Sequence, residues 1–201
     1  EDNTVMLIIN AIYFKGKWKL QFDEKETEEE PFYKPGGDSE DVPMMKQTDD
    51  FRIYDGEGFK MAEFPYGQGN FVMDIILPDA TDGLPALLST LTDASFTGWI
   101  QQMAARETDI FIPRFKYGYK KKLKEILSGM GMGVAFTGFA DFSNITEEAD
   151  LLINDVTHQA FIETNEEGTE AAAATIVDIG LTSMPLDPTV FKADHPFIYI
   201  I

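Results

Sequence analysis

The sequence is most informative over residues 166–175, which read Glu166-Glu167-Gly168-Thr169-Glu170-Ala171-Ala172-Ala173-Ala174-Thr175. Alanine is the best helix former, so the run is compatible with a surface helix that starts at Glu170 and is capped by Thr169. Two features favour a mobile loop that contains a latent strand. Gly168 frees the backbone just before the run, and the run continues into the alternating, β-branched segment Thr175-Ile176-Val177-Asp178-Ile179.

An extended conformation would sort these side chains onto two faces, because successive residues of a strand point in opposite directions. One face would carry only small or apolar side chains, from Thr169, Ala171, Ala173, Thr175 and Val177. That face could be buried between existing strands without a volume clash. The opposite face would carry Glu170, Ala172, Ala174 and Asp178.

Composition predicts a globular chain. Its 201 residues suffice for one domain with a sizeable core, and 44% of them are hydrophobic and 25% charged. The chain has no cysteine, so it can form neither a disulfide framework nor a thiolate metal site. The formal net charge of -19 argues against nucleic-acid and membrane-surface partners, which require a basic surface. No apolar run reaches the ~18 residues of a transmembrane helix.

Hydrophobic periodicity indicates an α+β fold made mostly of antiparallel strands with a few helices. Val5 to Tyr13 is apolar on both faces and predicts a fully buried strand. Further strands are expected over Phe51–Tyr54, Lys60–Pro65, Asn70–Pro78, Asp109–Phe115, Leu151–Glu163, Val190–Phe191 and Phe197–Ile201. Helices are expected over Leu84–Leu91, Phe96–Ala105 and Lys120–Met130.

Several short motifs in register along the whole chain resemble those of the serpin family of serine protease inhibitors. They include Asn10 to Trp18, Val42-Pro43-Met44-Met45, Glu63-Phe64-Pro65-Tyr66, Ile112-Pro113-Arg114-Phe115 and Val156 to Phe161, which leads into the run at 166–175. The resemblance implies a serpin-like α+β fold with an exposed reactive loop at about 166–190. It also implies that residues 1–201 are a partial domain, without the family's N-terminal helical half and last core strand.

The resemblance further implies suicide inhibition of a serine-type endopeptidase. The protease attacks the loop as a substrate and forms an acyl-enzyme, and the hinge at Glu166–Thr175 then inserts into a sheet as a new strand. Family-typical spacing places the reactive bond at Thr182-Ser183, with Leu181-Thr182 and Ser183-Met184 as the alternatives one residue away. Thr182 suits an elastase- or subtilisin-like protease and Leu181 a chymotrypsin-like one.

Four residues outside the loop are implied to control insertion. Asn10 and His158 would form a buried polar pair, the shutter, beneath the strands that separate. Trp18 would lie beneath the insertion point, the breach, where Glu166 and Arg114 would form a partly buried ion pair. Two of these residues also have a plain structural interpretation, His158 as a core histidine and Trp18 as a core tryptophan.

Enzymatic activity is not expected, because two histidines, no cysteine and no Gly-x-Ser-x-Gly motif leave little for a hydrolase. No cofactor or metal is expected. The predicted partner is the target protease, and the complete protein is expected to be monomeric and extracellular. Two alternative functions stay open: a non-inhibitory serpin with a chaperone, carrier or storage role, and a fragment that acts only as an interaction module.

Overall fold

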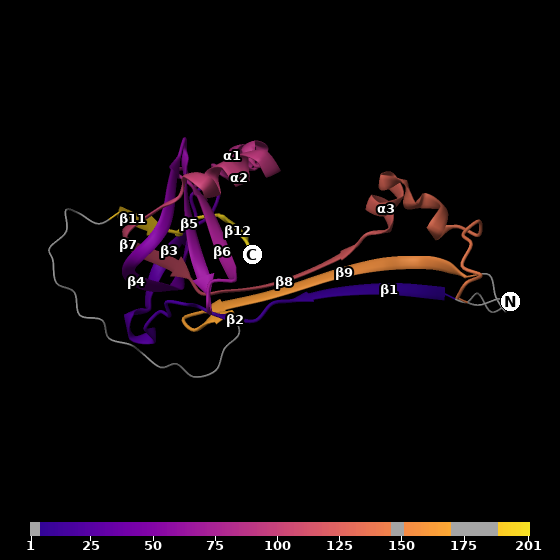
Figure 1. Cartoon of the computed structure of the whole chain (residues 1–201), viewed down its shortest axis with the longest axis horizontal. Coiled ribbons are helices and arrows are strands. Elements are labelled where there is room, and N and C mark those ends of the chain that lie inside the picture. The colour runs from indigo at the N-terminus through magenta and orange to yellow at the C-terminus, as the bar shows by residue number, and fades with distance from the viewer. Residues whose placement is uncertain (1–4, 146–150, 170–188) are drawn as a thin grey trace. The chain divides into compact units, whose positions relative to one another are not determined.

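The structure is a computed structural model, and it describes residues 5–145, 151–169 and 189–201. Strands dominate and helices are few and short, so the α+β class is confirmed. The chain divides into two compact units (Figure 1). The first unit comprises Glu1–Phe14 and Lys116–Ile162, and the second comprises Lys15–Phe115 and Glu163–Ile201.

Long strands and a short helical segment form the first unit. The strands are β1 (Val5–Tyr13), most of β8 (Phe115–Lys122) and most of β9 (Leu152–Asn165), and the helical segment comprises α3 (Lys124–Leu127), a π-helical turn (Ser128–Met132) and a 3-10 turn (Gly133–Phe136). Strand β9 lies between β1, to which it is parallel, and β8. A small core of Phe136, Ile153 and Val156 joins the helical segment to β9.

The predicted helix over Lys120–Met130 is wrong in its first part. Residues up to Lys122 belong to β8, and α3 covers only Lys124–Leu127. The amphipathic pattern was misleading because pairing with β9 overrides local helix preference. After Leu127 the helix is interrupted by Gly131, whose φ of 102° lies in the left-handed region.

The expectation of full burial for Val5–Tyr13 is also wrong. Leu7, Ile9 and Ile12 expose 62%, 71% and 57% of their surface. Among the described residues β1 pairs with β9 alone, and it contributes only Met6 to the packed core. The strand itself is confirmed, because a continuous apolar run specifies an extended segment but not what covers it.

A seven-stranded sheet forms the body of the second unit. Its order is β11-β7-β4-β5-β6-β12, with β3 paired to β4. The strands are β3 (Glu28–Tyr33), β4 (Ser39–Gly56), β5 (Phe59–Tyr66), β6 (Phe71–Pro78), β7 (Ala104–Pro113), β11 (Thr189–Lys192) and β12 (Ile198–Ile200). The three successive antiparallel strands predicted between Phe51 and Pro78 are confirmed as the end of β4, β5 and β6.

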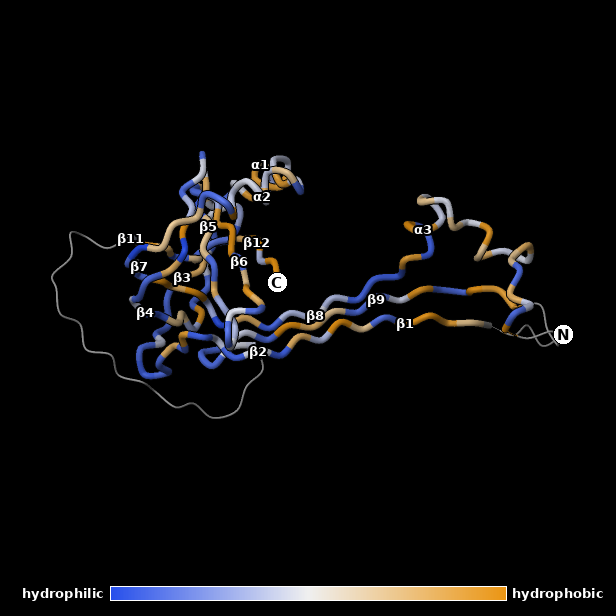
Figure 2. Tube along the Cα trace, in the orientation of Figure 1, coloured by the Kyte–Doolittle hydropathy of each residue, from blue (hydrophilic) through white to orange (hydrophobic). Residues whose placement is uncertain are grey.

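Two short helices, α1 (Leu84–Thr90) and α2 (Asp93–Gln102), pack on β5 and β6 through one apolar cluster (Figure 1). The buried members of the cluster are Phe59, Met61, Ile76, Leu87, Trp99 and Met103. Figure 2 shows the hydrophobic character of β5 and β6 that this packing requires. Helix α2 begins before the predicted Phe96, because Thr92 and Ser95 form a capping box.

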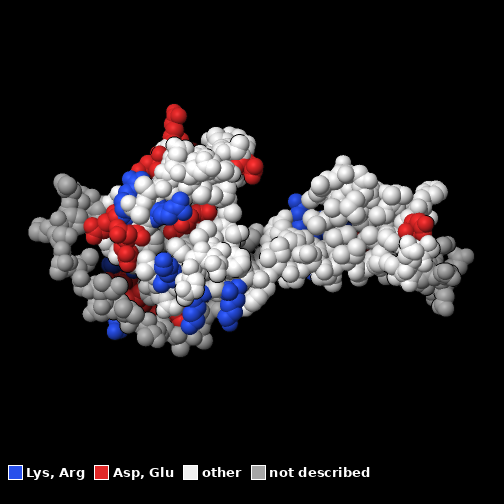
Figure 3. Space-filling view, viewed as in Figure 1, with Lys and Arg blue, Asp and Glu red and all other residues white. Residues whose placement is uncertain are grey.

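Charged side chains gather over the second unit on the face shown in Figure 3, whereas the first unit shows few of them there. No helix in the described ranges is long and apolar enough to span a membrane. The second unit also contains two very short strands, β2 (Gly16–Lys17) and β10 (Gly168–Thr169), and a 3-10 turn (Glu24–Glu26). These small elements build the candidate site.

Candidate functional site

The predicted hinge begins as part of a sheet. Strand β9 ends at Asn165, residues 166 and 167 form a turn, and the chain returns as β10. Thr169 pairs antiparallel with Thr164 of β9 on one side and with Gly16 of β2 on the other. Gly168 and Thr169, the third and fourth hinge residues, therefore already occupy a strand position between two neighbours. Residues Glu170, Ala171, Ala172, Ala173, Ala174 and Thr175, and the predicted reactive-bond residues Leu181, Thr182 and Ser183, lie outside the described residues.

Gly168 occupies a position that no other residue could take unchanged. Its φ is 141°, in the region that favours glycine. A Cβ atom built on it would lie 2.1 Å from the carbonyl oxygen of Gly16 and 2.7 Å from the Cα of Lys17. Glycine at 168 therefore lets the hinge approach β2 closely enough to pair with it.

Glu166 is held by a buried network at the turn. Its side chain is 3% exposed, and Arg114, just after β7, donates from Nε to both carboxylate oxygens at 2.7 and 2.8 Å. Arg114 Nη2 lies 2.6 Å from Oε1, and the hydroxyl of Thr27 donates to the same oxygen at 2.5 Å. The ion pair proposed from the sequence is thus present as a bidentate contact.

The geometry of this network shifts the pKa values of Glu166 and Arg114. Burial alone would raise the pKa of Glu166, but the hydrogen bonds from Arg114 and Thr27 outweigh it, so the pKa lies below its usual value. The pKa of Arg114 is raised, chiefly by its hydrogen bond to Glu166. The pair is therefore ionised at neutral pH and fixes the turn that precedes β10.

Trp18 lies at the centre of the site and is buried. Its indole Nε1–H donates to the carbonyl of Asn165 at 2.9 Å, and its backbone N–H donates to the carbonyl of Glu167 at 2.9 Å. The indole stacks on the ring of Tyr66 with centroids 4.4 Å apart. Trp18 therefore binds both ends of the turn that carries Glu166.

A buried hydroxyl pair completes the site. Tyr66 at the end of β5 and Thr169 of β10 lie with their side-chain oxygens 2.9 Å apart. Burial raises the pKa of Tyr66, and the bond to Thr169 lowers it by less. The sequence analysis missed the roles of Tyr66 and Thr27. The motif Glu63-Phe64-Pro65-Tyr66 was noted for its resemblance, but nothing in it indicated a contact with residue 169.

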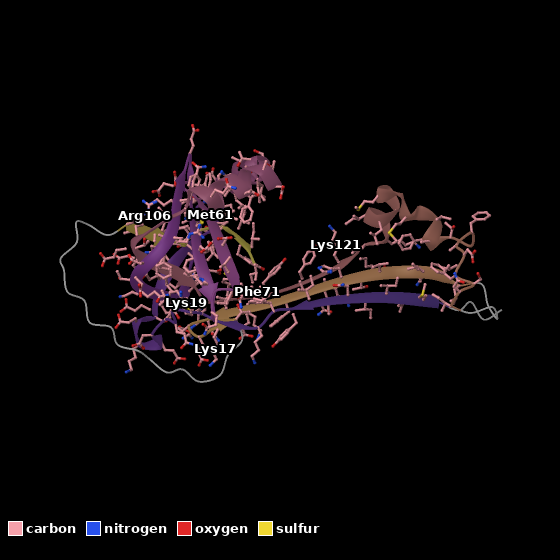
Figure 4. All side chains as sticks on the ribbon, viewed as in Figure 1. Lys17, Lys19, Met61, Phe71, Arg106 and Lys121 are labelled. Carbon is pink, nitrogen blue, oxygen red and sulfur yellow. The ribbon has the colours of Figure 1, made fainter. Side chains whose placement is uncertain are left out.

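Exposed side chains surround this network. Lys17, Lys19 and Phe71 are labelled in Figure 4, in the part of the second unit where β2 and the end of β9 lie. Phe71 exposes 61% of its surface, and Lys17 and Lys19 are also exposed. Glu167, the remaining described hinge residue, uses its backbone N–H to bind the side chain of Asn165 at 3.1 Å.

Asn10 and His158 lie in the first unit, directly opposite each other in the register of β1 and β9. Their predicted juxtaposition is therefore present, but their predicted burial is wrong. Asn10 is exposed and His158 is half-buried, because β1 packs little side-chain surface among the described residues. No hydrogen bond joins the two side chains in this part of the chain.

The site contains strand pairings, one ion pair and one hydroxyl pair, and no nucleophile paired with a base. Across the described ranges, no three His, Asp or Glu side chains come together in a way that could hold a metal ion. The arrangement can fix the first residues of a strand in a sheet and constrain the chain that follows.

Comparisons with known proteins identify the family and agree with the fold. A family model described as serpin (serine protease inhibitor) matches residues 1–201. Iripin-3 of Ixodes ricinus is 38% identical over 98% of this chain and 51% of its own length. A protein named serine protease inhibitor from Cyanea capillata is 37% identical over 100% of this chain and 54% of its own length.

Solved structures agree as well. Human thyroxine-binding globulin in complex with its hormone superposes with a TM-score of 0.85 at 26% identity, covering 99% of this chain and 52% of that one. The chain spans about half the length of the curated relatives it matches.

Proposed function

The chain belongs to the serpin family, and we propose that it carries the reactive loop and insertion site of a serine protease inhibitor that acts as a suicide substrate. Family membership sets the chain among protease inhibitors and their relatives rather than among enzymes. The observation that supports the proposal most strongly is the position of β10. Gly168 and Thr169 are already paired between β9 and β2, so a strand that extended β10 would enter the sheet there.

The proposed mechanism begins when a serine protease attacks the loop and forms an acyl-enzyme. The loop on the hinge side then extends β10 as a new strand, using the small face that begins at Thr169. Each added strand hydrogen bond contributes ~1 kcal/mol net, so ten or more residues supply on the order of 10 kcal/mol. The uncleaved form is accordingly stable by rate rather than by equilibrium.

The site network gives this mechanism a fixed starting point. The Glu166–Arg114 pair and the two Trp18 hydrogen bonds hold the turn, so insertion proceeds from a defined end. Asn10 and His158 are proposed as the shutter, since they lie on adjacent strands at matched positions. Thr182-Ser183 is the proposed reactive bond, with Leu181 as the alternative residue before the cut, and an elastase-, subtilisin- or chymotrypsin-like protease as target.

The proposed inhibition is tested by incubating the intact protein with subtilisin, pancreatic elastase and chymotrypsin. We expect an SDS-stable complex with at least one of them and a released C-terminal peptide that begins at Ser183. A matched variant, Thr182→Arg, should move complex formation toward a trypsin-like protease. Clean cleavage by all three proteases, with no complex, would contradict inhibition of these classes.

A carrier role is the second candidate, supported by the structural match to thyroxine-binding globulin, whose name states a bound hormone. Proteolysis separates the two candidates. An inserting serpin gains thermal stability after loop cleavage, whereas a serpin whose loop does not insert keeps its melting temperature. An extracellular location and a monomeric state stay predictions.

A further inference from the structure

Three charged residues form a row across the sheet of the second unit. Arg52 of β4 lies opposite Glu63 of β5, and Glu63 lies opposite Asp74 of β6. The row continues to Ile200 of β12, which pairs with Asp74. All lie on the sheet face that packs against α1 and α2, which also carries the buried Met61.

The row contains two carboxyl groups but one cation. Arg52 Nη1 lies 2.6 Å from Glu63 Oε2, and its Nη2 donates to the carbonyl of Ile100 at 3.0 Å, so both ends of the guanidinium are engaged. Asp74 is 4% exposed, and its Oδ1 has no hydrogen-bond partner among the described residues. A buried carboxylate left without a partner is costly, and like charges directly opposite on adjacent strands are destabilising.

No other cation on the described elements around Asp74 compensates for it, because Lys60 of β5 alternates onto the opposite sheet face and donates to the carbonyl of Val190. Helix α1 has no charged residue, and α2 has only Asp93, at its first position. Strand β12 has only Tyr199 as a titratable group, and its ring packs against Phe115. Asp74 therefore faces one like charge, Glu63, and one cation that is already bound to Glu63.

We propose that Asp74 is held as a neutral acid opposite the ionised Glu63, and that this protonation makes the pairing of β6 with β12 sensitive to pH near neutrality. The proton resides on Asp74, which becomes a neutral acid beside the ionised Glu63. Burial, reinforced by the charge of Glu63 and opposed by Arg52, raises the pKa of Asp74 to about 7. The inference does not depend on the proposed inhibitory function.

The direction of the effect follows from proton linkage. The folded state binds one proton more than the unfolded state between the ordinary pKa of 3.8 and the raised value of about 7. The contribution of Asp74 to folding stability is therefore fully present below the ordinary pKa of 3.8. Between this pKa and the raised one, the folding equilibrium constant falls by about tenfold per pH unit. Above the raised pKa the loss is complete, and the buried charge weakens the strands on either side of it.

The test compares the intact wild-type protein with Asp74→Asn, which imitates the neutral acid, and with Asp82→Asn, an exposed control of equal charge change. Urea unfolding is measured from pH 5 to pH 8. We expect Asp74→Asn to gain stability relative to wild type progressively as pH rises, and Asp82→Asn to follow the wild type. The protection factors of the Ile198–Ile200 amides, which correct for the rise of intrinsic exchange with pH, should fall with pH in wild type and not in Asp74→Asn.

Two results would overturn the proposal. One is a stability difference between Asp74→Asn and wild type that does not change with pH. The other is a carbon-13 titration of the Asp74 carboxyl in the wild-type protein with a midpoint in the ordinary range, below about 5. The titration uses the unmodified protein, so it decides the matter even if a variant fails to fold.

Discussion

At the scale of single residues, Gly168 and Glu166 carry the strictest demands. Gly168 needs a backbone conformation and a closeness to β2 that a Cβ would prevent. Glu166 needs its cation, because its carboxylate is buried while Arg114 remains partly exposed. Both demands concern the beginning of β10. Substituting Gly168 or Glu166 should therefore destabilise the hinge more than the rest of the sheet.

Replacing Gly168 by alanine should displace β10 from β2. The added Cβ would overlap the carbonyl oxygen of Gly16, a backbone atom that cannot move aside without breaking the pairing. We expect faster amide exchange at Thr169 and Trp18 and a reduced fraction of SDS-stable complex. The matched control is Gly98→Ala in α2, where nothing lies within 4 Å of the new methyl group and alanine should stabilise by up to ~1 kcal/mol. Equal behaviour of the two variants would contradict the role given to Gly168.

Replacing Arg114 by methionine should leave a buried carboxylate without its partner. Breaking a buried pair costs ~3–5 kcal/mol and a surface pair under ~1, and because Arg114 is 41% exposed we expect about 2 kcal/mol. The bidentate geometry predicts that Arg114→Lys restores only part of this. Urea unfolding of the three proteins at neutral pH measures the loss. An Arg114→Met variant as stable as wild type would show that the pair does not stabilise the hinge.

The Glu166–Arg114 pair also predicts that folding stability is lost in acid. The pKa of Glu166 is lowered in the folded protein, so its contribution is present above the ordinary value of 4.5 and is lost as pH falls through the lowered value. Glu166→Gln should be less stable than wild type at pH 7, and the difference should shrink toward pH 3. A difference that stays constant over this range would contradict the ionised pair.

At the scale of elements, β10 depends on β5 as well as on its two strand neighbours. Tyr66 closes β5, stacks on Trp18 and reaches Thr169 with its hydroxyl. This contact is the last one that the described part of the hinge makes before Glu170. It is therefore the first candidate for a contact that sets how far β10 extends in the uncleaved protein.

A double-mutant cycle of Tyr66→Phe and Thr169→Val tests that contact. Each change removes one of the two hydroxyl groups that form this buried contact, so each single variant should lose stability. We expect a coupling of ~1 kcal/mol between them, since neutral hydrogen bonds contribute about that much. Additive effects, measured by urea unfolding, would show that the two hydroxyl groups do not interact.

The sequence predicted where strands lie more reliably than which segments pair with them or cover them. The antiparallel strands between Phe51 and Pro78 follow from alternation and glycine-containing turns, which are local signals. The exposure of β1 and the strand character of Lys120–Lys122 depend on which other segments lie alongside, and no local pattern reports that. The Glu166–Arg114 pair could be anticipated from family resemblance, whereas Tyr66 and Thr27 reach the hinge only through the fold.

At the scale of the whole molecule, the chain spans about half the length of the curated relatives it matches. Within one unit of this chain of net charge -19, two carboxyl groups differ in their surroundings: Asp74 is buried without a cation of its own, whereas Glu166 is buried in an ion pair with the partly exposed Arg114. The two are expected to respond to acid in opposite directions. Acid weakens the hinge through Glu166 and strengthens the edge of the sheet through Asp74.

The proposed mechanism requires above all that Gly168 and Thr169 be the fixed start of a strand that the loop completes after cleavage. We would cut the loop of the intact protein with a protease that forms no complex, and compare the melting temperature and amide exchange before and after. The proposed insertion predicts a large rise in melting temperature and new protection in the part of β9 that precedes Thr164. An unchanged melting temperature with unchanged exchange would contradict insertion and favour a non-inhibitory role.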